Sequence, residues 1–254
     1  KADKVETTFD DMFNFSRASE ATYVDSTGTL QTVAANVPRR GHHIWNGTEW
    51  VNKGVLIESE ARTNLQIDSE NPMANASSGN TFSATSTLID DFAWIQYTGS
   101  GVFRWRSHNI TVALNDPITY FCEVKKPFAE ASGIAELGGV GASNGLLRFD
   151  LTAGTIVSSN KSWSNGRIQP LSDGWFRVSG TFAPSSTTEE FGIWRADTDG
   201  LYFRRPQVEL GSTPSSYIPT AGATVTRAAE TIDTPSANLP YDPTAMWFTL
   251  KGTE

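Results

Sequence analysis

Hydrophobic and polar residues alternate along much of the chain, with the period of two that is typical of a β-strand with one buried face. In residues 118–125, for example, Ile118, Tyr120, Cys122 and Val124 fall on one face. Shorter runs of the same kind occur at 147–151, 176–182, 191–194 and 208–210. No window of helical length has a convincing period of 3.6. Closely spaced turns separate the runs, so the pattern predicts an all-β fold, an antiparallel β-sandwich of the jelly-roll type.

Turn signals and prolines divide the chain into three predicted regions. Residues 1–60 form a segment rich in β-hairpins, including one over 44–51 with Asn46-Gly47 as a two-residue turn. Residues 61–219 form the jelly roll. Residues 220–254 contain several prolines and predict an extended linker, followed by the first strand of a truncated next domain.

Composition and charge narrow the function classes. The 254 residues are 38% hydrophobic and 19% charged, and eight Trp and fourteen Phe can supply a sizeable core. The net charge is −8, and no run of basic residues occurs. The attraction that drives binding to nucleic acid or to anionic membranes is therefore missing, and no apolar stretch approaches the ~20 residues of a membrane span.

Cys122 is the only cysteine, which excludes an internal disulfide and a cysteine-based zinc site. It lies in an apolar run, so we expect a buried thiol. A disulfide-free β-protein fits a bacterial or viral product that folds in a reducing cytoplasm.

Several phrases in a fixed order resemble a family of bacteriophage virion proteins, the tail or head fibre components and related prophage proteins. The phrases occupy residues 15–24, 54–65, 173–177, 207–212, 216–220 and 225–229. Members of this family carry a jelly roll similar to carbohydrate-binding modules, often before a concanavalin-like lectin domain.

The resemblance implies an adhesion protein of the virion, made in the host cytoplasm, that binds host-surface glycan without catalysis. Its implied partners are that glycan, other virion proteins and further copies of the chain. Two alternatives stay open: a structural capsid or tail decoration or fibre adaptor without glycan binding, and a polysaccharide-degrading enzyme.

Aromatic and planar polar side chains are the candidates for sugar binding, because rings stack on pyranose faces and guanidinium groups pair with hydroxyls. One candidate stretch contains Trp94, Tyr97, Arg104, Trp105 and Arg106. Adjacent residues of a strand face opposite sides, so the alternative makes Trp105 part of the core and the arginines a solvated face.

Two further tryptophans are candidates. Trp163 lies among small polar residues next to a turn, which favours an exposed ring, and Trp194 could line the concave side of the roll. The alternative for both is a structural role.

The resemblance also implies a structural calcium ion, because such jelly rolls often hold Ca²⁺ between their first and last strands. Asp68, Glu70 and Glu209 are the matching carboxylates. The alternative interpretation is solvated surface acids, and no other cofactor is expected.

Enzyme signatures are weak. The three histidines form no H-E-x-x-H motif. Residues 141–145 match G-x-S-x-G, but a strand-like run follows where a nucleophile elbow needs a helix. We therefore predict a non-catalytic protein.

Overall fold

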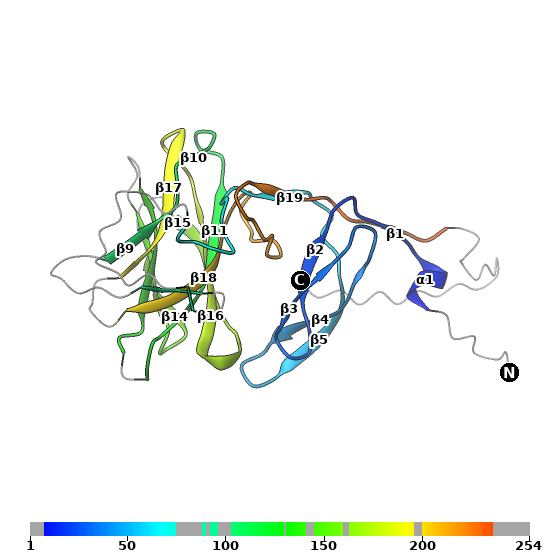
Figure 1. The fold of residues 1–254 in the computed structure, drawn as a ribbon, viewed down its shortest axis with the longest axis horizontal. Coiled ribbons are helices and arrows are strands. Elements are labelled where there is room, and N and C mark those ends of the chain that lie inside the picture. The colour runs from blue at the N-terminus through cyan, green and yellow to red at the C-terminus, as the bar shows by residue number, and fades with distance from the viewer. Residues whose placement is uncertain are drawn as a thin grey trace.

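The computed structural model shows an all-β protein, as the alternating pattern predicts. The residues that it describes are 8–74, 88–89, 92–95, 103–129, 131–140, 145–159, 163–195 and 200–235. Within these ranges the one α-helix is α1 (Phe9–Met12), and no helix is long and apolar enough to span a bilayer. Every strand pairing among the described residues is antiparallel, and the two largest sheets belong to one sandwich (Figure 1).

The first large sheet has the order β10-β17-β12-β13-β14, and β9 also pairs with β17. The bounds are β9 Phe103–Arg106, β10 Ile110–Thr111, β12 Ile134–Val140, β13 Leu146–Asp150, β14 Thr155–Ser159 and β17 Thr188–Arg195. The second large sheet has the order β15-β16-β11-β18-β8-β7. Its bounds are β7 Leu88–Ile89, β8 Phe92–Ile95, β11 Ile118–Lys125, β15 Trp163–Pro170, β16 Trp175–Phe182 and β18 Leu201–Leu210. A 3₁₀ turn, η1 (Ser172–Gly174), joins β15 to β16.

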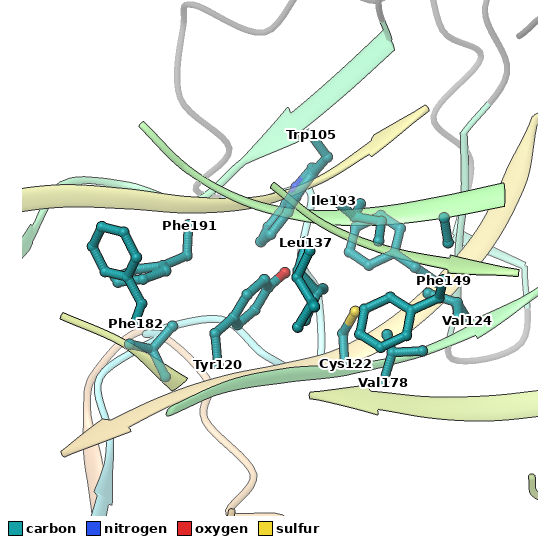
Figure 2. Close-up of a cluster of buried hydrophobic side chains, with 14 of the residues drawn as sticks. Trp105, Tyr120, Cys122, Val124, Leu137, Phe149, Val178, Phe182, Phe191 and Ile193 are labelled. Atoms are coloured by element: carbon teal, nitrogen blue, oxygen red, sulfur yellow. The ribbon is translucent and has the colours of Figure 1, made fainter. Parts of the chain in front are cut away.

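The core lies between these two sheets and is built from the alternate residues of their strands (Figure 2). Tyr120, Cys122 and Val124 of β11 are fully buried there, and Leu137 and Phe149 face them from the first sheet. The predicted buried thiol is thus confirmed. The intervening residues of β11, such as Phe121 and Glu123, face away from the core, because successive side chains of a strand point to opposite faces.

The N-terminal region consists of two hairpins, as predicted. One pairs β2 (Ala21–Val24) with β3 (Leu30–Val33), and the other pairs β4 (Arg39–Trp45) with β5 (Trp50–Leu56). The turn of the second hairpin is longer than the predicted two residues. Trp45 pairs with Trp50, and the Asn46 side chain accepts hydrogen bonds from the Thr48 and Glu49 backbones at 2.9 Å. This side-chain bonding stabilises a four-residue loop instead.

The described part of the predicted extended C-terminal segment returns to the N-terminal region. β19 (Val225–Arg227) pairs with β6 (Arg62–Asn64), and β20 (Thr231–Asp233) pairs with β1 (Asn14–Ser16). The predicted strand around Trp247 lies outside the described residues.

Buried ion pairs hold these distant segments together. Glu230 accepts from Arg17 at 2.7 Å and from Arg39 at 2.7 Å, and all three side chains are fully buried. Glu58 accepts from Arg39 at 2.7 Å and lies 3.3 Å from Arg227. We call these five residues the junction network. Many of its arginine N–H groups also donate to backbone carbonyls, such as that of Ala34, so their charge is matched by acceptors on several sides.

Candidate functional site

A cluster of charged side chains lies on the outer face of the second sheet, beside residues of the N-terminal hairpins that line the same cavity. The side chains of Arg177 in β16 and of Arg204 and Arg205 in β18 surround the carboxylate of Glu123 in β11. The distances from the guanidinium nitrogens to the carboxylate oxygens are 2.9, 2.7 and 3.1 Å respectively. We call these four residues the arginine cluster.

The carboxylate of the cluster is more deeply buried than the arginines, and the arginines outnumber it. The Glu123 side chain is 2% exposed, whereas the three arginine side chains are 18–20% exposed. Burial raises the pKa of Glu123, but the attraction of Arg177, Arg205 and Arg204 outweighs it and holds the pKa at about 2. Arginine stays charged at every physiological pH. Within the cluster itself, three positive groups therefore face one negative group.

Aromatic rings contact two of the arginines of the cluster. The guanidinium carbon of Arg204 lies 4.2 Å from the Trp175 ring centroid, and that of Arg177 lies 5.1 Å from the Phe121 centroid. Such cation–π contacts orient a guanidinium group without using its N–H donors.

The backbone at Arg205 is unusual. Its φ of +53° is in the left-handed region, at a bulge where the β11–β18 register shifts between Phe121 and Glu123. A non-glycine residue pays conformational strain there. The bulge lets Arg204 and the adjacent Arg205 both reach Glu123, which a regular strand would prevent because neighbours face opposite sides.

Three cavities meet at the cluster, and Arg177 lines all of them. The first, of about 110 Å³, lies between the cluster and the hairpin residues His42 and Trp50. The second, of about 190 Å³, includes Tyr23 and Glu58 in its lining. The third, of about 580 Å³, extends over the outer side of β15 and β16 and includes Ile156 and Gln169 in its lining. Gln169 also lines the first cavity. We call the three together the arginine groove.

His42 reaches the groove from β4 and lines the first two cavities. Its Nδ1 accepts a hydrogen bond from the Val24 backbone N–H at 3.3 Å, which assigns the ring proton to Nε2. Burial lowers its pKa, and the positive charge of Arg39 lowers it further. His42 is therefore neutral at neutral pH and adds a donor to the groove without adding charge.

Two of the predicted sugar-binding tryptophans are in the core of the sandwich instead. Trp105 is fully buried, and its Nε1 donates to the Pro72 carbonyl at 2.8 Å. Trp163 is 4% exposed, and its Nε1 donates to the Gly145 carbonyl at 3.0 Å. The polar neighbours of Trp163 in sequence suggested an exposed ring, but β15 turns that ring inward onto Phe182. Neither ring has a face open for stacking in this conformation.

Trp194 is on the outer side of the first sheet, opposite the core residues Phe191 and Ile193 of its own strand. It is 7% exposed, because its ring lies over Gly138 of β12. For Trp94, Arg104 and Arg106 the structure gives the backbone pairing in β8 and β9, and their side chains are outside the described part. Tyr97 lies outside the described residues.

The three carboxylates predicted to bind calcium each accept hydrogen bonds from within the chain. The two segments do lie together, since the Leu65 N–H donates to the Val208 carbonyl at 2.7 Å. However, Glu209 accepts from the backbone N–H and hydroxyl of Ser215 at 2.6 Å, Asp68 accepts from the Gly222 N–H at 2.7 Å, and Glu70 accepts from the Tyr217 hydroxyl. Among the described residues, no three acidic, histidine or cysteine side chains gather to hold a metal ion.

The arginine cluster was missed at the level of sequence, although part of its signal was present. Arg177 belongs to the Asp-Gly-Trp-Phe-Arg phrase, and the alternation of β16 already places it on the face opposite the core. Nothing in the sequence signals that β11 and β18 bring Glu123, Arg204 and Arg205 beside it. In comparisons with known proteins, no family model and no curated protein matches this chain.

Proposed function

We propose that this chain is a non-catalytic adhesion protein of a bacteriophage particle that binds host-surface carbohydrate in the arginine groove. The observation that carries the proposal is the groove itself, where planar polar groups and a ring line one hollow between two parts of the fold. Gln169 and Arg177 offer paired hydrogen bonds for hydroxyl groups, and the half-buried Trp50 offers an indole.

The carboxylates of the groove support binding without catalysis. Glycoside hydrolysis uses two carboxyl groups, one of which donates a proton and so needs a raised pKa. In the described lining, Glu123 and Glu58 are the acidic residues. Although burial raises the pKa of each, the neighbouring arginines lower both pKa values below the usual range. Neither is suited to donate a proton at neutral pH.

Repetition on the particle would raise a weak affinity per site. A phage particle presents many copies of its surface proteins, and linked sites bind a glycan-covered surface far more tightly than one site does. The proposal therefore includes homo-oligomers and contacts with other virion proteins.

A glycan array tests the proposal with the full chain displayed on beads, so that weak sites act together. We expect binding to at least one host-surface polysaccharide, and a loss of about tenfold or more for Trp50→Ala combined with Gln169→Ala. Phe128→Ala is the matched control, because Phe128 is 51% exposed and lies outside the groove lining. Absence of glycan binding, or equal binding by all variants, contradicts the proposal.

A second candidate, a structural decoration or fibre adaptor, is favoured by a different observation. Trp105, Trp163 and Trp194 are buried within this one chain, so three of the rings predicted to contact a glycan instead stabilise the fold. This candidate expects the assembled particle to bury the arginine groove against a neighbouring protein. Hydroxyl-radical footprinting of the particle would then find Trp50 protected, whereas the adhesion proposal expects it to stay reactive.

A further inference from the structure

We infer that the saccharide bound in the arginine groove carries an anionic group, a carboxylate or a phosphate, which pairs with Arg177, Arg204 and Arg205. This inference rests on the proposed function and adds the chemical class of the ligand. It depends on four features of the groove: its charge, its unused donors, its rigidity and its size.

The charge is the first feature. The whole chain has a net charge of −8, yet the arginine cluster places three arginines around one carboxylate. Of the acidic residues that line the groove, Glu58 is already paired with Arg39 and Arg227. An acidic protein that gathers several arginines at a hollow attracts anions to that hollow, because low-dielectric walls concentrate the field there.

Unused donors are the second feature. A guanidinium group has five N–H donors, and in the described part the hydrogen bonds of Arg177 and Arg205 go to Glu123 alone. The Nε of Arg177 is buried and has no hydrogen-bond partner there. The arginines of the junction network differ, because they also donate to backbone carbonyls. A buried donor without a partner costs free energy, and an anionic ligand oxygen would satisfy it.

Rigidity is the third feature. Glu123, the supporting rings and the bulge at Arg205 hold the three guanidinium groups in place before any ligand arrives. Preorganised donors bind more tightly, because less side-chain entropy is lost on binding. The strain at Arg205 is consistent with a functional site, where such backbone outliers cluster.

Size is the fourth feature. The cavity beside the cluster, of about 110 Å³, has room for a few water molecules and suits a small charged group rather than a sugar ring. The adjoining cavity of about 580 Å³ shares Arg177 and has room for the ring. A single acidic sugar could thus occupy both, with its charged group at Arg177.

Titration calorimetry of the full chain at low salt tests the inference with four probes: glucose, glucuronate, glucose 6-phosphate and inorganic phosphate. We expect glucuronate or glucose 6-phosphate to bind at least about tenfold more tightly than glucose, and the preferred one identifies a carboxylate or a phosphate source. Arg177→Gln should reduce this binding about tenfold or more, since a charge-assisted pair is lost. Lys53→Gln, which removes one positive charge from an exposed site outside the groove lining, should not.

Glu123→Gln separates binding from folding. Glutamine keeps an acceptor oxygen that can still orient the arginines, while the negative charge beside them is lost, so we expect tighter binding of the anionic probe, which damage to the fold would not produce. Weaker binding by folded Glu123→Gln, or unchanged binding by folded Arg177→Gln, overturns the inference. Equal binding of inorganic phosphate and glucose 6-phosphate overturns its saccharide part. If the glycan array detects binding to neutral glycans only, the inference fails while the proposed function stands, and if it detects no glycan binding, both fail.

Discussion

At the scale of single residues, arginine side chains serve two different purposes in this protein. Arg17 and Arg39 are fully buried, and their donors are taken up by Glu230 and by backbone carbonyls. Arg177 and Arg205 stay partly open and share one carboxylate. Arg17 and Arg39 have several hydrogen-bond acceptors around them and stabilise the fold. Arg177 and Arg205 share one acceptor group, so they retain N–H donors that can bind a ligand.

Glu123 should make stability depend on pH in the acid range. Its pKa is held at about 2 in the folded protein against a usual value of 4.5, so the folded state prefers the ionised form. This preference stabilises the fold by about 3 kcal/mol above pH 4.5 and is lost as the pH falls from about 4.5 to about 2. Urea unfolding between pH 7 and pH 2 measures the effect, and Glu123→Gln should show a shallower loss over that interval. Parallel curves for the two proteins would contradict this account.

At the scale of elements, close contacts between strands depend on residues without a side chain. Gly192 lies in the middle of β17 and pairs with Gly138 of β12 on one side and with Arg106 of β9 on the other. A Cβ atom at Gly192 would overlap the carbonyl oxygen of Trp105, which is backbone and cannot rotate away. The seating of Trp105 in the core therefore depends on this glycine.

Gly192→Ala should destabilise the sandwich by about 1–3 kcal/mol, the usual cost of overpacking, because β9 must shift away from β17. Gly139→Ala, on the neighbouring strand β12, is the control. Its Cβ would lie 3.4 Å from Phe182, which is ordinary contact. Thermal unfolding followed by tryptophan fluorescence compares the two, and equal melting temperatures would rule out the proposed clash.

At the scale of the whole molecule, the junction network joins two segments that are far apart in the sequence. It connects Arg17 near the start with Glu230, which is 213 residues away. The β6–β19 pair lies between the sandwich and the hairpins, whereas β1, which pairs with β20, lies on the side of the hairpins away from the sandwich (Figure 1). The hairpins that form one wall of the arginine groove are therefore held by residues from the C-terminal segment.

Glu230→Ala should cost about 3–5 kcal/mol of stability, because Arg17 and Arg39 would remain buried without their carboxylate. Glu60→Ala is the matched control, since Glu60 is 72% exposed in its pair with Arg62 and should cost less than about 1 kcal/mol. Chemical unfolding gives both values. Limited proteolysis should show earlier cleavage in the hairpins for Glu230→Ala alone, and similar behaviour of the two variants would exclude this role for the network.

The sequence by itself determined the fold class, because alternation with a period of two assigns each residue of β11 and β16 to the core or to the outer face. It also determined the hairpin nature of the N-terminal region and the burial of Cys122. Only the tertiary structure decided what covers each outer face. Burial of Trp163 and Trp194, pairing of β19 and β20 with β6 and β1, and the gathering of three arginines around Glu123 all depend on contacts between residues far apart in the chain. Local periodicity carries no information on such contacts, so the candidate site emerged from the fold and not from any motif.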